Sequence, residues 1–185
     1  MGRTGDHAAG DVEPGFWVEE LMEAFGAGLN QMPRHIVLPA AFRQAMLDHV
    51  SSCYPEEACG LLGGQAAGVG CRVAAVLPVE NALHSPVRYR MEPSAQLQGF
   101  LRLEEQGLDL VGIYHSHPTG PDHPSQTDLD EFAYPGVLAL IWSPDGRPGS
   151  GDSWQLKAFW IEKQLNSHKV AQVPIQTPDE SAGVN

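Results

Sequence analysis

Cysteine is scarce in this sequence, with only Cys53, Cys59 and Cys71 among 185 residues. Three is an odd number and no two of them form a Cys-x-x-Cys pair, so the pattern indicates reduced thiols and no disulfide framework. A chain of this length buries roughly two thirds of its unfolded surface on folding and needs no covalent cross-links. We therefore expect one globular domain with extensions, in a reducing compartment.

The sequence also contains few cationic residues and no long apolar runs. Eleven Lys and Arg oppose 23 Asp and Glu, which gives a formal net charge of −12. Nucleic acids and anionic membranes are bound largely through clustered cations, and the cations here are scattered. No apolar stretch approaches the roughly 20 residues that span a bilayer, and the N-terminus lacks the apolar core of a signal peptide. We expect no nucleic-acid or membrane partner and a cytoplasmic location.

The acidic excess is concentrated in residues 1–30, which contain six acidic residues and one arginine, a net charge of −5. Apolar residues recur with helical spacing from Trp17 to Leu29, which predicts an amphipathic helix over about 15–31. We expect its apolar face to dock on its own domain, with a second copy in a homodimer or another partner as the alternatives.

The periodicity of the remaining sequence predicts one mixed α/β (α+β) domain. Alternating or continuous apolar runs predict strands at 35–38, 57–64, 71–80, 87–91, 108–114, 136–142 and 154–161. Helical spacing and Pro or Gly boundaries predict helices at 39–53, 93–107 and 129–132. We divide the chain into an acidic N-terminal extension, a main domain, and a C-terminal strand with a polar tail: residues 1–32, 33–163 and 164–185.

Two histidines follow the strand predicted at 108–114 directly, as His115-Ser-His117. Residues two apart on an extended segment point the same way, so both imidazoles can reach one metal ion. Asp128 follows an irregular Pro- and Gly-rich loop and can supply a third, carboxylate ligand. The alternative is a structural histidine pair, with Asp128 as a first-turn helix acid behind a Ser125 or Thr127 cap. Three protein ligands leave an open position on zinc, which is typical of catalytic sites.

Such a site also needs a base, and Glu57 is the candidate because it precedes a strongly apolar strand. The alternative is a solvated edge residue like its neighbour Glu56. Cys59 could be considered as a thiol nucleophile, but a small buried core residue is the better interpretation. His123 we interpret as a solvated loop residue.

Together these residues resemble the complete motif of the JAMM (MPN+) zinc metalloprotease family. The motif consists of Glu57, then His115-Ser-His117, seven residues, Ser125, two residues and Asp128. The flanking segments 55–63, 79–81, 91–96 and 112–118 resemble the single-domain bacterial and archaeal branch, and the resemblance covers about residues 34–162. It implies the MPN/JAB fold, a cytidine-deaminase-like mixed curved sheet flanked by helices, with 33–163 as the catalytic domain.

The resemblance also implies the roles of the motif residues. His115, His117 and Asp128 would bind one Zn²⁺ per chain, Glu57 would be the general acid/base, and Ser125 would hydrogen-bond the oxyanion of the tetrahedral intermediate. Ser116 we expect to support the backbone.

The implied reaction is hydrolysis of the peptide or isopeptide bond after the C-terminal Gly-Gly of a ubiquitin-like or sulfur-carrier protein. Alternatives are a zinc amidohydrolase acting on small peptides, or a deubiquitinase-like enzyme of a prokaryotic ubiquitin-like pathway. A non-catalytic MPN scaffold is less favoured, because such relatives usually lack a motif residue and this sequence lacks none.

Overall fold

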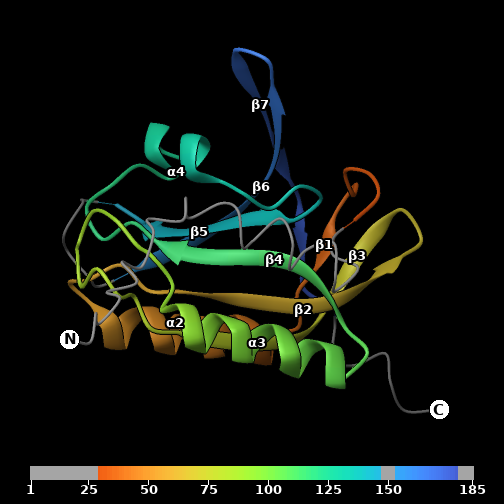
Figure 1. Cartoon of the computed structure of the whole chain (residues 1–185), viewed down its shortest axis with the longest axis horizontal. Coiled ribbons are helices and arrows are strands. Elements are labelled where there is room, and N and C mark those ends of the chain that lie inside the picture. The colour runs from red at the N-terminus through yellow and green to blue at the C-terminus, as the bar shows by residue number, and fades with distance from the viewer. Residues whose placement is uncertain (1–28, 147–152, 179–185) are drawn as a thin grey trace, which may run out of the picture.

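A computed structural model describes residues 29–146 and 153–178 of the chain. Within these residues a single mixed sheet contains eight strands in the order β7-β6-β5-β4-β2-β3-β1-β8 (Figure 1). The described elements are, in chain order, β1 (Ile36–Val37), α2 (Ala40–Cys53), β2 (Cys59–Ala67), β3 (Gly70–Val79), α3 (Pro93–Glu105), β4 (Asp109–Ser116), α4 (Gln126–Glu131), β5 (Leu138–Pro144), β6 (Trp154–Gln164), β7 (Ser167–Val173) and β8 (Ile175–Gln176). The predicted mixed α/β (α+β) class is confirmed.

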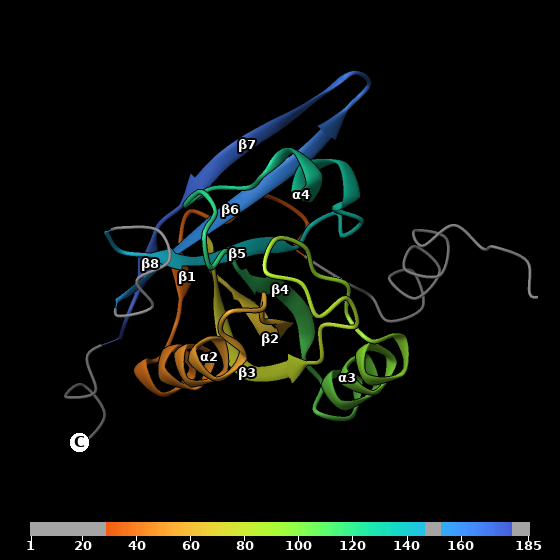
Figure 2. The same cartoon turned by 90° about the vertical axis from the view of Figure 1, so that its left-hand side faces the viewer.

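The helices α2 and α3 cover opposite faces of this sheet (Figure 2). Met46 and Val50 of α2 belong to one apolar core, which includes Leu62, Tyr114 and Leu140 of three neighbouring strands. The residues that precede these three on their strands (Leu61, Ile113 and Ala139) pack instead with Phe100 and Leu103 of α3. Successive strand residues point to opposite faces, so each central strand contributes to both cores.

Pairing within the sheet brings β4 to its centre. It runs antiparallel to β2 and parallel to β5, with Cys59 opposite His115 and Ser116 opposite Trp142. Gly60 permits the close approach of β2 to its neighbours, because a Cβ there would lie 2.4 Å from the Tyr114 ring and 2.6 Å from the Leu77 carbonyl oxygen. The predicted hairpin of β2 and β3 is present.

The prediction of a strand at 87–91 was wrong. Its only ladder contact within the described residues is one bridge between Met91 and Asn81. The backbone groups of Arg88 and Arg90 instead hydrogen-bond the Asn81 side chain, which replaces a partner strand. The third helix begins at Gln126, earlier than predicted, because Ser125 caps it.

The sheet continues beyond residue 163, where we placed the end of the main domain. That residue lies inside β6, β7 pairs with β6, and β8 pairs with β1. The helix predicted over 15–31 lies almost wholly outside the described residues. None of the helices in the described part of the chain is long and apolar enough to cross a membrane.

Candidate metal centre

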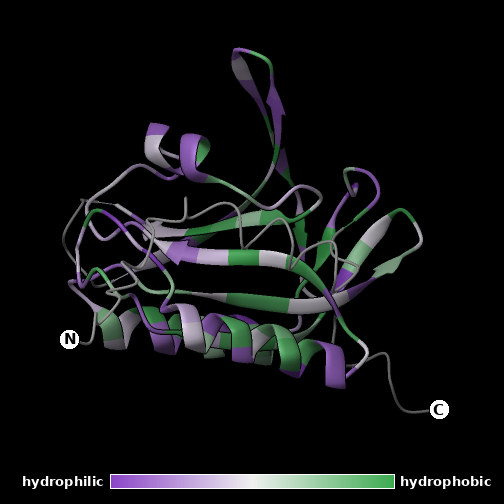
Figure 3. Ribbon diagram, in the orientation of Figure 1, coloured by the Kyte–Doolittle hydropathy of each residue, from purple (hydrophilic) through white to green (hydrophobic). Residues whose placement is uncertain are grey.

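The carboxyl end of β4 carries the two histidines. His115 lies two positions after Ile113 and therefore on the α3 face, whereas Tyr114 enters the α2-side core. His115 and His117 are only 2% and 4% exposed. Figure 3 shows β4 passing from hydrophobic colours in its middle to hydrophilic colours at this end. The strand thus brings polar ligands to the edge of an apolar core.

Asp128 reaches the same place from the first turn of α4. Its amide N–H donates to Ser125 Oγ at 3.2 Å, and its carboxylate Oδ2 accepts from the Ser125 amide at 2.7 Å. This reciprocal capping box fixes the start of the helix and the direction of the carboxylate. The two alternatives for Asp128 are therefore compatible, since it is a first-turn acid and also faces the histidines.

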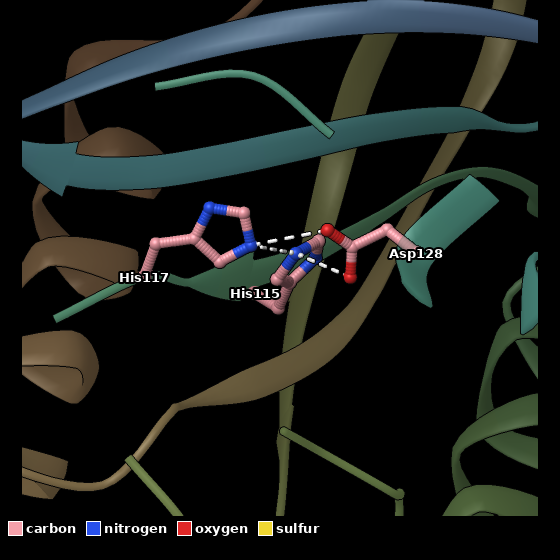
Figure 4. A group of neighbouring side chains, drawn as sticks. All are labelled: His115, His117 and Asp128. Carbon is pink, nitrogen blue, oxygen red and sulfur yellow. Dashed lines mark hydrogen bonds and ion pairs between the residues drawn. The ribbon is translucent and has the colours of Figure 1, made fainter. Parts of the chain in front are cut away.

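His115, His117 and Asp128 form the cluster drawn in Figure 4. The two Nε2 atoms lie 3.0 Å apart. The carboxylate oxygens lie 3.3 Å from His115 Nε2 and 3.2 Å from His117 Nε2. Zinc bonds of about 2.0–2.1 Å at tetrahedral angles place ligand atoms about 3.3 Å apart, so this spacing fits zinc.

The surroundings of the histidines select the nitrogen that faces the cluster. His117 Nδ1 lies 2.7 Å from the Pro121 carbonyl, which can only accept, so Nδ1 donates and Nε2 is the nitrogen that can bind a metal after losing its proton. The His115 ring stacks on Tyr89 with centroids 4.6 Å apart and an interplanar angle of 25°. Both imidazoles are thus held with Nε2 toward Asp128.

Burial and hydrogen bonding set the charges of the cluster when no metal is bound. Burial lowers the pKa of His115 despite the adjacent Asp128. Burial also acts to lower the pKa of His117, but hydrogen bonds to Asp128 and the Pro121 carbonyl raise it above its ordinary value. Burial acts to raise the pKa of Asp128, yet hydrogen bonds from both histidines and Ser125 hold it well below its usual range. A neutral His115 and an ionised Asp128 are ready to bind a cation.

Glu57 lies beside this cluster, although it comes from a segment far away in the sequence. Its neighbour Ala58 is tied to Ser116, whose Oγ accepts from the Ala58 amide at 2.8 Å and whose amide donates to the Ala58 carbonyl at 3.0 Å. The predicted supporting role of Ser116 is confirmed. Glu57 is 4% exposed, and burial raises the pKa of its carboxyl to about 8, with His117 lowering it and Asp128 raising it further.

Comparison with known proteins agrees with this geometry. Residues 39–157 match the family model described as prokaryotic homologs of the JAB domain, and this range contains all five motif positions. The chain belongs to this family. The resemblance to JAMM metallopeptidases is thereby confirmed, and the protein is an enzyme of this type.

Characterised relatives of this JAB-family chain carry peptidase names. It is 37% identical over 115 residues to a desampylase of Haloferax volcanii, covering 60% of this chain and 81% of that protein. A desampylase of Pyrococcus furiosus is 34% identical over 140 residues, 76% of this chain and 89% of that one. A CysO-cysteine peptidase of Mycobacterium tuberculosis is 35% identical, covering 58% and 73%.

A solved structure supports the fold of this JAB-family chain. A protein of Desulfitobacterium hafniense superposes with a TM-score of 0.64 at 28% identity, covering 80% of this chain and 97% of that protein. The predicted MPN/JAB fold is confirmed.

The metal centre opens into a cleft of about 790 Å³. Glu57, His117, Ser125 and Asp128 are among the residues that line it. One wall is the segment 86–91, and the other includes α4 and residues 132–134. Arg88 Nη2 pairs with Glu131 Oε1 at 2.6 Å and so joins the two walls.

Two residues set aside by sequence reasoning are not part of the centre. Cys59 is buried, its Sγ lies 3.5 Å from the Val79 carbonyl, and burial raises the pKa of its thiol to about 12. The core interpretation of Cys59 is confirmed. His123 is exposed and lies 3.1 Å from Asp122. Within the part of the chain that the structure describes, His115, His117 and Asp128 are the one cluster suited to a metal.

Sequence reasoning missed the functional position of Tyr89 and Asn81. Tyr89 lines the cleft and stacks on His115, while Asn81 hydrogen-bonds the Glu57 carbonyl. The local signal for Asn81 was an uncharged polar residue two positions after the end of the apolar strand β3. Tyr89 carried no such signal, because an aromatic residue in a short apolar segment is equally typical of a core.

Proposed function

We propose that this enzyme binds one Zn²⁺ through His115, His117 and Asp128. With this ion it would hydrolyse the peptide or isopeptide bond after the C-terminal Gly-Gly of a ubiquitin-like or sulfur-carrier protein. The observation that carries the proposal is the three-ligand cluster with a buried carboxyl, Glu57, beside it at the inner end of a cleft. Three protein ligands leave one position open for chemistry, unlike a closed structural zinc site.

Zinc in such a site polarises the scissile carbonyl and lowers the pKa of water from about 16 toward 7. Glu57 accepts a proton from the attacking water and later gives it to the leaving amine. Burial raises the pKa of this carboxyl above its ordinary value, which makes Glu57 a stronger base than a solvated glutamate.

Ser125 is suited to stabilise the oxyanion. Its Oγ accepts from the Asp128 amide, which uses a lone pair and leaves its own proton free to donate. Ser125 also lines the cleft beside Asp128. The hydroxyl is held by the start of α4, so it is preorganised before substrate arrives.

The substrate class rests on the cleft and on the relatives. A tail without side chains can lie along the wall formed by 86–91 and pair backbone to backbone. Relatives named desampylase and CysO-cysteine peptidase support a protein-linked amide as the bond that is cut.

The test is to incubate the zinc-loaded protein with ubiquitin-like proteins extended beyond Gly-Gly and to identify the products by mass spectrometry. We expect cleavage directly after Gly-Gly, abolished by a chelator and restored by zinc. Matched substrates ending in Ala-Ala plus the same extension provide the control. Cleavage of short acyl-peptides alone would instead identify a small-peptide amidohydrolase.

A further inference from the structure

Asn81 is a buried amide that uses all its hydrogen-bonding capacity. It is 7% exposed. Its Nδ2 donates to the carbonyls of Glu57 at 3.0 Å and Arg88 at 3.1 Å. Its Oδ1 accepts from the amides of Leu83 and Arg90, both at 3.1 Å. Two carbonyls facing one end and two N–H groups facing the other define the orientation of the amide.

One of these bonds holds the segment of the proposed base. Glu57 donates its own amide to the Ser85 carbonyl at 2.9 Å, while its carbonyl accepts from Asn81. On the other side Ala58 is tied to Ser116 of β4. Glu57 therefore lies between an anchor on β4 and an anchor on the loop that follows Asn81.

Two other bonds hold the wall of the cleft. Asn81 contacts the carbonyl of Arg88 and the amide of Arg90, the two residues that flank Tyr89. Tyr89 stacks on the His115 ring. No neighbouring strand pairs with Arg88 or Tyr89 in the described residues. The hydrogen bonds of the Asn81 side chain take the place of those that a partner strand would make.

We propose that Asn81 is a positioning residue that couples the placement of Glu57 to that of the cleft wall 86–91. This inference rests on the proposed function, because the expected changes in kcat and KM are those of the proposed reaction. One side chain then determines both the position of the base and the surface along which the substrate tail lies. Loss of its contacts lowers kcat through Glu57 and raises KM through the wall.

Two variants separate the contacts. Asn81→Ala removes all four. Asn81→Asp keeps the acceptor for Leu83 and Arg90 but cannot donate to the carbonyls of Glu57 and Arg88. A control, Val50→Ala, removes apolar contacts in the α2-side core, away from the cleft, and lowers stability without touching this network.

Two measurements on the zinc-loaded proteins test the proposal. The first is kcat and KM on a Gly-Gly-extended ubiquitin-like protein, and the second is amide hydrogen exchange in peptides covering 82–91. We expect kcat to fall about 10- to 100-fold in both Asn81 variants, since a displacement of about 1 Å can cost that much. Exchange in 82–91 should accelerate at least about tenfold through local opening. KM should rise most in Asn81→Ala, and zinc content should stay unchanged.

The control should melt at a lower temperature while keeping its kcat and its exchange pattern in 82–91. Wild-type kcat in Asn81→Asp, unchanged exchange in 82–91, or loss of zinc together with activity would each overturn the positioning role. If the wild-type enzyme cleaves no Gly-Gly substrate, the proposed function fails. The exchange data then still decide whether Asn81 organises this wall.

Discussion

Two histidine networks lie on opposite faces of the sheet at β4, one half-buried and one buried. On the α2 side, His49 Nδ1 lies 2.9 Å from the Tyr114 hydroxyl and Nε2 lies 3.3 Å from Cys53 Sγ. On the α3 side, His115 and His117 face Asp128. Tyr114 and His115 are adjacent in the sequence, so two neighbouring residues of one strand belong to two different networks.

The two networks differ in the groups that their imidazole nitrogens face. Both nitrogens of His49 already have partners, none of them a carboxylate, and burial lowers the pKa of this imidazole. In the α3-side network each Nε2 converges with the other on a carboxylate that hydrogen bonds keep ionised. A histidine bonded only to neutral groups stabilises the fold, whereas two imidazoles that face one carboxylate provide three ligand atoms for a cation.

Removing a ligand should have the largest effect. His117→Ala is expected to lose zinc and, with it, at least about 10³-fold in turnover, because the ion supplies several kcal/mol of transition-state stabilisation. Metal analysis of the purified variant and its rate on a Gly-Gly-extended substrate measure both. A zinc-free variant with near-wild-type turnover would contradict the metal assignment.

Changing the base should separate chemistry from metal binding. Glu57→Gln keeps the shape of the side chain but cannot accept a proton, so kcat should fall about 10²- to 10⁴-fold. Zinc content should remain that of the wild type, since Glu57 is not in the ligand cluster. Full activity in this variant would assign the base elsewhere.

The hydroxyl of Ser125 is expected to have the next largest effect. Ser125→Ala removes the proposed oxyanion donor and should lower kcat about 10²- to 10³-fold. It also removes the cap of α4, which costs about 1 kcal/mol of stability. Ser125→Thr keeps a hydroxyl and a cap and serves as the matched variant. If Thr and Ala reduce kcat equally, the hydroxyl does not act on the oxyanion.

The α2-side network should affect stability alone. His49→Ala leaves the buried Tyr114 hydroxyl without this partner and should lower the free energy of unfolding by about 1–3 kcal/mol. Zinc content and kcat should be unchanged, as measured by metal analysis and initial rates. A loss of zinc in this variant would remove the distinction between the two networks.

The last prediction is a pH dependence of the stability of the metal-free protein. Burial raises the pKa of Glu57 from 4.5 to about 8, so between these values the folded state binds a proton that the unfolded chain does not. Stability from this group is therefore lost as pH rises through that range. The Tm of chelator-treated Glu57→Gln should therefore rise relative to that of the wild type by about 10 °C between pH 5 and 8.5. A constant difference across this range would show that Glu57 is not desolvated.

Local sequence patterns predicted much of this structure because their physical causes are local. Proline and glycine boundaries with helical spacing placed α2 and α3. The short helix was predicted too late in the sequence, because the cap at Ser125 begins it at Gln126. The segment 87–91 was wrongly predicted as a strand, since it has the composition of one while the Arg88 carbonyl and the Arg90 amide bond to the Asn81 side chain.

The chemistry of the candidate centre follows from local sequence. Strand geometry directs His115 and His117 to one side, and a capping box links Ser125 to Asp128 over three positions, so both pairs follow from local spacing. The groups that surround these residues, in contrast, are brought there by long-range packing. Glu57, Asn81 and Tyr89 reach the cluster through sheet register and loop contacts across the chain. Such contacts depend on how the whole sheet packs, so the residues next to them in the sequence do not predict them.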